Sequence, residues 1–356
     1  MEQLLASDAL SDSGKIMLGG AVVGLIFGYC AQQSRFCLRS ACIEFWGGQL
    51  GPKLAVWLAV FGTALLATQA LLANGGLNPQ DVRQLATVGS LSGAIVGGLL
   101  FGVGMILARG CASRLLVLSA TGNARALIAG LVVTVAAQAS LSGVLSPLRE
   151  ALNRLWVVGP STRDMAQHLP DGTGLALGVG CVALSGALAW RNRVAVRTTA
   201  TAAGVGLAVG LGWAFTAALS RVSFEPVTVG SVTFTGPSAD TLMALIVRPD
   251  VVPSFGIGLV PGVFAGSLAA TLLHREFRLQ GFDAGTGTLR YLVGAVLMGF
   301  GGMAAGGCAV GAGVTGGSVL SLTAWVALLS MWIGAGAAGL LLERAEAIGR
   351  RETAQL

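Results

Sequence analysis

Three cysteines in this chain follow breaks in apolar runs, where a thiol could meet a small solute. The segments 102–111 and 299–308 each end an apolar run, turn glycine-rich and finish on a cysteine, Cys111 or Cys308. Aligned on the cysteine, they share three glycine pairs: Gly102/Gly299, Gly104/Gly301 and Gly110/Gly307. A match this long between distant segments indicates an internal duplication. The third cysteine, Cys37, follows the first apolar run.

The surroundings of these cysteines favour a small anion with a soft atom. We expect each of the three to begin a short interior helix, where free amides and the helix dipole attract an anion. Arginines flank two of them, in the segments Arg35–Arg39 and Arg109–Arg114, with no acid between. Because thiols interact with polarizable sulfur or selenium better than with hard oxyanions, a sulfur anion is favoured. The alternative is that these arginines only anchor the cytoplasmic interface.

The remaining polar residues do not indicate an enzyme or a resident metal. Cys30, Cys42 and Cys181 read as small core hydrophobes. His168 and His274 both fall in loops, so no set of nitrogen and sulfur ligands converges. We therefore predict no catalytic residue, no metal site and no cofactor. The acids nearest to the short segments are Glu44 and Asp240, and Glu44 could either cap a helix or carry a proton.

Composition identifies the chain as an integral membrane protein. Of its 356 residues 54% are hydrophobic and 11% are charged, and the mean hydropathy is +0.77. Strand-type alternation is absent, so helices must satisfy the backbone. The net charge of +6 comes from basic residues scattered singly in short loops, which argues against nucleic acid. The first apolar stretch follows an acidic start, which indicates a retained helix and no cleaved signal peptide.

The apolar segments predict an all-α integral membrane protein with about nine transmembrane helices and four short re-entrant helices. The expected crossings are 16–31, 53–73, 89–108, 124–142, 174–190, 199–219, 254–274, 289–306 and 319–342. The short apolar segments between them are 36–46, 111–119, 238–247 and 308–317.

The order of these segments predicts two inverted repeats. We expect a first repeat at 15–142, a connector with an outer loop and a linking helix at 143–198, a second repeat at 199–342 and a cytoplasmic tail at 343–356. A weaker pairing of 35–41 with 233–239 places Thr235 opposite Cys37. An odd number of crossings separates the two starts, so the second unit enters from the opposite side, and the site should lie near the midplane.

The distribution of basic residues predicts the orientation. With the amino terminus outside, fifteen of the 22 lysines and arginines fall on the inner side. We therefore expect the amino terminus outside and the carboxyl terminus in the cytoplasm. The long polar loop at 143–173 would lie outside, where it either covers the outer mouth or only connects the halves.

Four motifs in order resemble the YeeE/YedE sulfur-transport family of bacterial inner-membrane proteins, known for thiosulfate uptake. They are the segments Ser34–Cys37, Gly102–Cys111, Thr233–Ala239 and Gly299–Cys308, and the resemblance extends over residues 15–342. It implies a monomeric, hourglass-shaped permease in which Cys37, Cys111 and Cys308 pass thiosulfate along. It also implies a cytoplasmic sulfur carrier of the TusA type as partner. The chain departs from the family pattern where Arg109 and Arg114 stand in place of small residues. The fourth corner of the repeat carries Thr235, not a thiol, so the site would be asymmetric.

The expected function is import of thiosulfate, or a related sulfur anion, into the cytoplasm. The predicted substrate path consists of Cys37, Cys111, Cys308, Arg35, Arg39, Arg109, Arg114, Gly110, Gly307 and Thr235. The alternatives are a membrane-bound sulfur-relay protein that forms a cysteine persulfide, a transporter of selenium species or soft metals, and an accessory subunit of another transporter.

Overall fold

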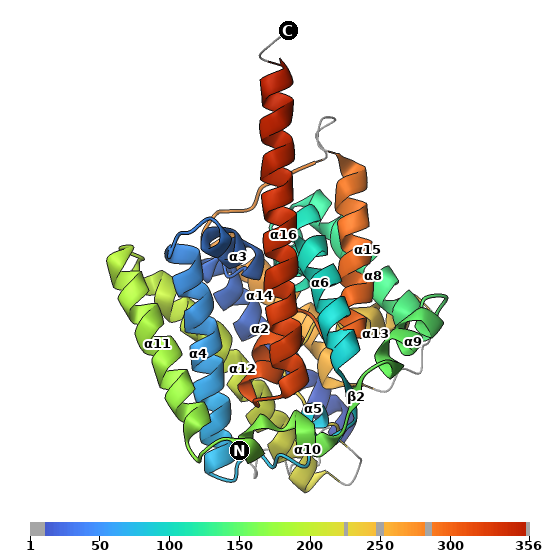
Figure 1. The fold of residues 1–356 in the computed structure, drawn as a ribbon. Coiled ribbons are helices and arrows are strands. Elements are labelled where there is room, and N and C mark those ends of the chain that lie inside the picture. Colours follow the sequence, from blue (N-terminus) through green and yellow to red (C-terminus); the bar gives the residue numbers. More distant parts are fainter. Residues whose placement is uncertain (1–10, 224–226, 247–252, 282–286, 354–356) are drawn as a thin grey trace.

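Nine helices in the described part of the chain are long and apolar enough to cross a membrane, which confirms the predicted all-α membrane protein. The computed structural model describes residues 11–223, 227–246, 253–281 and 287–353. The long helices are α2 (Asp12–Ser34), α4 (Pro52–Ala73), α6 (Leu91–Leu107), α8 (Ala124–Ser142), α11 (Thr173–Arg191), α12 (Val196–Val222), α14 (Phe255–Leu273), α15 (Thr288–Ala304) and α16 (Leu322–Thr353). Of these, α4, α6, α11, α15 and α16 run roughly side by side (Figure 1).

Short helices form in all four of the short apolar segments. They are α3 (Leu38–Trp46), α7 (Ala112–Ser119), α13 (Thr235–Ile246) and the π-helix η2 (Ala309–Gly316). The turns before three of them pass through the left-handed region, at Arg35 (φ 53°), Arg109 (φ 57°) and Gly306 (φ 81°). Each of these residues stands two positions before a cysteine, so the same backbone device recurs in both halves of the sequence. Re-entry of the short helices from one membrane face stays a prediction.

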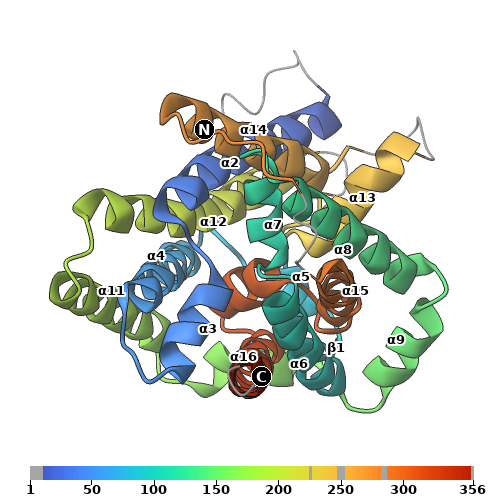
Figure 2. The same ribbon diagram turned by 90° about the horizontal axis from the view of Figure 1, so that it is seen from above.

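The long helices form two groups that each combine the beginning and the end of the chain. Seen from above (Figure 2), α2, α12 and α14 lie on one side of α7, and α6, α15 and α16 lie on the other. Helix α2 packs against α14 and α12, and α4 packs against α12 and α11. Helix α6 packs against α16 and α15, and α15 also packs against α8. The two proposed repeats therefore interlock in space and do not form separate bodies.

Glycines set the close approach of α2 and α14, which make the most extensive helix pair. Both helices carry a glycine at every fourth position, Gly20/Gly24/Gly28 in α2 and Gly258/Gly262/Gly266 in α14. A Cβ added to Gly24 would contact the Leu259 carbonyl oxygen, and one added to Gly262 would contact that of Ala21. Backbones this close leave no room for any side chain at the contact.

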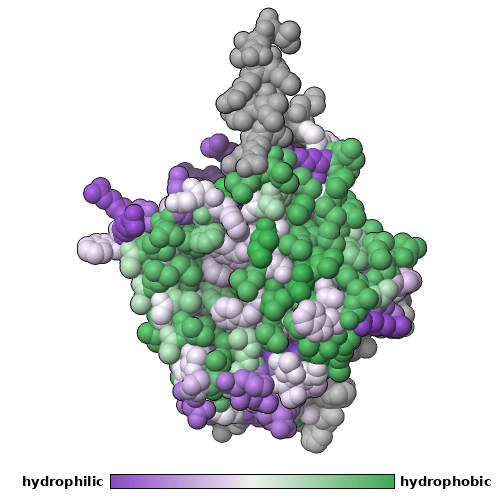
Figure 3. Space-filling view, viewed as in Figure 1, coloured by the Kyte–Doolittle hydropathy of each residue, from purple (hydrophilic) through white to green (hydrophobic). Residues whose placement is uncertain are grey.

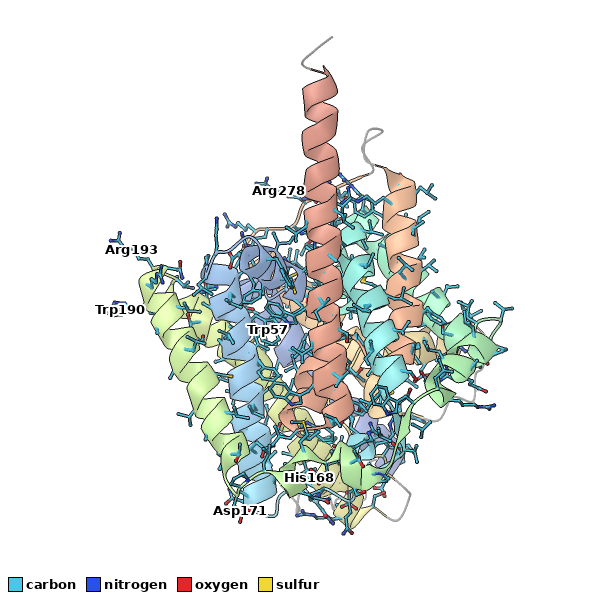
Figure 4. The ribbon with its side chains drawn as sticks, in the orientation of Figure 1. Trp57, His168, Asp171, Trp190, Arg193 and Arg278 are labelled. Carbon is cyan, nitrogen blue, oxygen red and sulfur yellow. The ribbon has the colours of Figure 1, made fainter. Side chains whose placement is uncertain are left out.

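An aromatic cluster joins the two helix groups. Trp57 of α4 stacks on Phe61, with ring centroids 5.2 Å apart, and meets Trp332 of α16 edge-on at 5.3 Å. Phe61 in turn meets Trp325 of α16 at 5.4 Å. Trp57 lies between α4 and α16 at mid-height in the molecule (Figure 4). The cluster fixes the two groups relative to each other because such pairs add to the burial of their apolar area.

The visible surface has a broad hydrophobic band between hydrophilic ends (Figure 3). Arg193 and Arg278 lie at one end of the helices, and His168 and Asp171 lie at the other (Figure 4). This separation is the one that the predicted topology requires, but which end faces the cytoplasm stays a prediction. Helix α16 continues beyond the predicted last crossing, to Thr353, so most of the expected tail is helical, and 354–356 lie outside the described residues.

The 143–173 loop folds against the end of the molecule at which α6, α11 and α16 begin. It contains α9 (Ser146–Arg154), β2 (Val157–Val158), α10 (Pro160–Arg163) and the 3-10 helix η1 (Met165–His168). Strand β2 pairs antiparallel with β1 (Gly89–Ser90), and Arg163 donates to the Thr87 carbonyl next to α5 (Arg83–Ala86). The Met165 amide donates to the Leu320 carbonyl at 3.1 Å. The loop is thus held to the starts of α6 and α16, and whether it covers an outer mouth stays a prediction.

Candidate functional site

Each of the three predicted cysteines is the N-cap residue of a short helix. Cys37 precedes α3, Cys111 precedes α7 and Cys308 precedes η2, all with extended backbone angles. Their exposed fractions are 9%, 1% and 1%, respectively. Each cysteine therefore stands at the start of a short helix, after a glycine-rich break for Cys111 and Cys308 and after the left-handed turn at Arg35 for Cys37. An anion must displace packed side chains to reach these thiols.

Cys37 and Cys111 come together at the meeting of α3 and α7. Their thiols lie close enough for a hydrogen-bond interaction, and neither thiol caps its own helix. Ser113 Oγ lies 3.3 Å from the Cys111 sulfur, and Ser40 interacts with Cys37 through both its backbone and its side chain. These two serines follow the cysteines within one helical turn, a signal that the sequence analysis missed. The pair of thiols and hydroxyls forms a polar spot inside an apolar protein.

Two half-buried arginines supply positive charge at this spot. Arg114, in the first turn of α7, acts electrostatically on both thiols, and its Nη1 is buried without a hydrogen-bond partner among the described residues. Arg39, in the first turn of α3, acts on Cys37, and its Nε is likewise buried without a partner. Burying a charged donor without a partner is costly, so an anion would stabilise both side chains.

The other two arginines of the predicted path point elsewhere. Arg35 is exposed and lies 3.9 Å from a Glu276 carboxylate oxygen. Arg109 is also exposed, with its guanidinium 5.7 Å from the Tyr291 ring centroid. Both side chains leave from left-handed turns, which direct them away from the following cysteine. The structure therefore divides the four predicted arginines into an inner pair and an exposed pair.

Cys308 and Thr235, which both belong to the second half of the sequence, are buried. The Cys308 sulfur accepts from the Gly311 amide at 3.4 Å, so this thiol is held by its own helix, unlike the other two. Thr235 begins α13, and its Oγ1 is buried without a partner among the described residues. The structure gives no interaction of Cys308 with Cys37 or Cys111. It does pack η2 against α7, which brings the two cysteine-capped helices into contact.

The glycines next to the two repeated cysteines are tightly packed. A Cβ on Gly307 would lie 2.7 Å from the Ala312 amide nitrogen, and one on Gly110 would lie 3.3 Å from a Leu115 side-chain carbon. Gly307 therefore allows η2 to close onto the preceding turn. Gly110 is less constrained, because a flexible side chain is its nearest neighbour.

A polar hollow of about 500 Å³ lies next to the turn that precedes Cys308 in the chain. Its lining includes Arg83, Arg149 and Arg163, together with the turn Gly306–Gly307 that leads into Cys308. The sequence analysis counted these arginines only toward the orientation. No local signal marks them, because the tertiary fold brings α5 and the 143–173 loop together.

The described residues also place the other polar side chains that the sequence singled out. The Glu44 carboxylate accepts from the amides of Lys53 and Leu54, at 2.8 and 2.9 Å, so it caps α4, as one of its two interpretations predicted. Cys42 is fully buried, and Cys30 and Cys181 are partly buried beside helix contacts. No group of three histidine, cysteine or acidic residues within the described ranges could hold a metal ion.

Comparison with known proteins gives a family and two named relatives. The family model described as "Sulphur transport" matches residues 33–337. The thiosulfate transporter TsuA of Escherichia coli K12 is 26% identical over 353 residues, which cover 90% of this chain and 92% of the relative. The thiosulfate transporter TsuA of Spirochaeta thermophila is 28% identical over 335 residues, which cover 88% and 96%. Because the family match spans most of a chain with nine membrane-length helices, this protein is a multi-pass membrane transport protein, not an enzyme, and belongs to the sulphur transport family.

Proposed function

We propose that this chain is a permease that imports thiosulfate, or a closely related sulfur anion, into the bacterial cytoplasm. The names of both relatives support the substrate. The observation that carries the proposal is the facing thiol pair of Cys37 and Cys111 beside the unpartnered guanidiniums of Arg39 and Arg114. Thiosulfate has a soft terminal sulfur and a double negative charge, so one such site can satisfy both of its properties.

The proposed mechanism is a stepwise, noncovalent passage. The anion enters past Gly306–Gly307, and its terminal sulfur contacts the Cys308 thiol. It then moves across the contact of η2 and α7 to Cys111 and Cys37, where Arg114 balances its charge. Each thiol offers a weak S–H donor to a polarizable sulfur, so binding is weak enough to permit release. Sulfate lacks the soft atom and would gain little from these contacts.

Inverted repeats and an outside amino terminus are part of the proposal. The helix pairs correspond under such an inversion: α2 packs on α14 as α12 packs on α4, and α6 packs on α16 as α15 packs on α8. The left-handed residues two positions before Cys111 and Cys308 support the same relation. The outer mouth would then be the end that the 143–173 loop covers, and the thiol pair would lie nearer to the cytoplasm.

Uptake by the purified protein in liposomes tests the proposal. Labelled thiosulfate should accumulate with the wild type, and Cys37→Ala, Cys111→Ala and Cys308→Ala should each lower the rate at least about tenfold, or about 1.4 kcal/mol. Cys181→Ala is the matched control, because Cys181 lies on α11, away from the short helices. Labelled sulfate should not accumulate. Normal uptake by all three cysteine variants, or equal uptake of sulfate, would contradict the thiol path.

The direction of transport, the partner and the oligomeric state need separate measurements. Selective labelling of Arg191→Cys at one end of the helices and Asp171→Cys at the other, in intact cells, should show that only the second is accessible from outside. A TusA-like sulfur carrier should bind the cytoplasmic face, and the purified permease should be monomeric by light scattering. Mass spectrometry that found a persulfide on Cys37 or Cys111 would identify a sulfur relay instead.

A further inference from the structure

A narrow apolar groove of about 170 Å³ lies between the short helices α7 and α13 and the long helices α8 and α14. Helices α8 and α13 lie farther from the centre of the bundle than α7 (Figure 2). Three of the lining leucines, Leu127, Leu131 and Leu245, are 47%, 46% and 81% exposed. In a protein that crosses a bilayer, leucines this exposed contact lipid tails. The groove is therefore open to the membrane, and a molecule from the membrane can enter it.

The walls of the groove offer few free hydrogen-bonding groups. The hydroxyls of Ser119, Thr134 and Thr241 line it, but each donates to a carbonyl of its own helix, at 2.6, 2.9 and 2.7 Å, respectively. Thr235 Oγ1, which has no partner among the described residues, lies at the buried end beside Phe234. Hydroxyls that are satisfied by their own helix leave hydrocarbon groups as the accessible surface. The groove is thus suited to a hydrocarbon chain.

The groove exists because two helices on this side of the bundle are too short to cross the membrane. Helix α7 has eight residues and is about 12 Å long, against about 30 Å for the hydrocarbon core. Helices α8 and α14 each pack against both α7 and α13, so the long helices bridge a gap that neither short helix fills. The gap reaches Ala112, the neighbour of Cys111. A chain within it would therefore close this wall of the protein next to the thiol pair.

A polar hollow of about 210 Å³ adjoins the groove and shares Leu115 and Ala126 with it. Its polar lining residues, none of them acidic in the described part of the chain, are Arg109, Asn123, Arg125, Gln280 and Tyr291. Gln280 closely follows Arg278, which lies at one end of the helices (Figure 4). Helix α8 begins at this end and leads from the hollow into the groove. The two cavities thus form a polar, basic mouth at the end of the helices and an apolar groove at membrane depth.

Arg109 is the residue of this mouth best placed to meet a charged group. It is exposed and forms no ion pair within the described ranges, and its guanidinium lies 5.7 Å from the centroid of the Tyr291 ring. A cation held over a ring keeps its charge and can still donate to a phosphate oxygen. Arg125 Nε, by comparison, donates to the Gly281 carbonyl at 2.9 Å. A headgroup contact therefore belongs mainly to Arg109, which the proposed passage of the anion does not use.

We propose that the groove and the hollow together form a binding site for one anionic phospholipid, with its phosphate at Arg109 and one acyl chain between α7, α8 and α13. The order of the two parts matches an amphiphile, because the apolar part follows α8 for about 12 Å from Ala126 to Thr134. Basic pockets between membrane helices hold acidic headgroups in this way. A free phosphate would not fill the groove, and a lipid without net charge would gain less from Arg109.

Photolabelling of the full chain tests this site. The protein is reconstituted in phosphatidylcholine liposomes with a trace of phosphatidylglycerol that carries a diazirine in one acyl chain, and mass spectrometry of peptides locates the adducts. The adducts should concentrate on the residues of α7, α8 and α13 that line the groove. Unlabelled phosphatidylglycerol should displace the probe, and added phosphatidylcholine should be about fivefold less effective, because one basic side chain near an anionic lipid contributes about that factor.

Two variants test the two parts of the site separately. Arg109→Gln should lower the labelling of the groove about fivefold, because it removes the charge at the mouth. Gly130→Phe should abolish the labelling, because its ring would fill the groove. A Cβ added to Gly130 lies 3.8 Å from the Leu115 Cβ, so the substitution begins without a clash. The matched controls, which should label like the wild type, are Arg191→Gln and Gly186→Phe at exposed positions of α11.

Two results would overturn the proposal. Adducts spread evenly over α8 and α11 would show ordinary boundary lipid only. Equal displacement by both lipids, together with unchanged labelling of Arg109→Gln, would show that the groove does not select an anionic headgroup. Because labelling requires no transport, this test is independent of the proposed function. The lipid site can stand where thiosulfate is not carried, and it can fail where thiosulfate is carried.

Discussion

The thiol of Cys37 faces the thiol of Cys111, although the two residues cap different short helices. Both are free cysteines, and both lie within the field of Arg114. One soft atom placed between α3 and α7 would therefore touch both thiols at once. The two cysteines should act as a single binding unit, whereas Cys308, held by the Gly311 amide, should act separately.

The first prediction is that the Cys37→Ala and Cys111→Ala effects are not additive. Each single variant should lower thiosulfate uptake about tenfold, and the double variant should be little worse than either, because each change already breaks the shared contact. Initial uptake rates in liposomes measure this. Combination of Cys37→Ala with Cys181→Ala is the control, and it should equal Cys37→Ala alone. A loss of about a hundredfold in the double cysteine variant would show that the thiols act independently.

The second prediction concerns the buried charge of Arg114. Arg114→Gln should reduce uptake about tenfold or more and at the same time raise the thermal stability of the protein, because it removes a buried guanidinium without a full set of partners. Uptake and melting in detergent should be measured on the same preparation. Arg191→Gln, an exposed arginine at the end of α11, should change neither. Lower stability together with lower uptake would indicate a structural role for Arg114.

The sequence predicted the helices and the cysteine caps because both depend on local pattern. Apolar runs of membrane length mark the crossings, and the glycine-rich breaks mark where α6 and α15 end. The inner and exposed arginines could not be separated by composition alone. Arg39 and Arg114 stand in the first turn after a cysteine, and Arg35 stands in the left-handed turn before one. The direction of a side chain depends on this position, not on its distance from the cysteine in sequence.

The polar hollow lined by Arg83 and Arg163 could not be predicted from the sequence, for a different reason. Arg83 and Arg163 are distant in the chain and meet only because β1 pairs with β2 over two residues per strand, Gly89 with Val158 and Ser90 with Val157. Strands this short carry no alternating pattern, so no local signal predicts their pairing. The same holds for the contact of α10 with α5, which the hydrogen bond from Arg163 to Thr87 secures.

The third prediction is that Arg109→Gly is tolerated. Arg109 adopts φ 57°, a conformation that costs a non-glycine residue about 1–2 kcal/mol, and Gly306 stands at the matching position before Cys308. Glycine removes this strain but loses the contact with Tyr291, worth about 0.5–1 kcal/mol at an exposed site. Stability should stay equal or rise slightly, and uptake should remain within about twofold of the wild type. A large loss of uptake with unchanged stability would show that Arg109 is part of the substrate path after all.

The fourth prediction tests the packing of α2 against α14. Gly24→Leu should destabilise the protein by about 1–3 kcal/mol or prevent its folding, because a side chain there must displace the Leu259 backbone. Thermal melting in detergent and yield of monodisperse protein measure this effect. Gly186→Leu is the control, because Gly186 is exposed on α11 with nothing within 4 Å of its added Cβ. Equal stability of the two variants would contradict the close approach of the helices.

The fifth prediction rests on Asp240, a carboxyl of α13 that lines a second hollow, which shares Arg83 with the polar hollow next to Cys308. Burial raises the pKa of Asp240, and the Arg83 charge partly opposes this shift. The charged groups that face Asp240 across the hollow are Arg83 from α5 and Asp12 from α2, and Asp12 lies 3.0 Å from Lys15. The charge that Asp240 can offset is therefore mainly that of Arg83.

Ionisation of Asp240 should weaken the attraction of Arg83 for the anion as the pH rises. Below its raised pKa the carboxyl is neutral and Arg83 attracts the anion fully, whereas above it the carboxylate offsets Arg83, so the KM for thiosulfate should increase with pH. The stability contribution has the same sign, because an acid with a raised folded-state pKa loses stability as the pH rises through that value. Asp240→Asn should remove both dependences and hold the KM at its low-pH value. Asp171→Asn, at an exposed position of the same end, should retain them. A KM that falls with rising pH in the wild type, or an unchanged profile in Asp240→Asn, would show that this carboxyl does not act on Arg83.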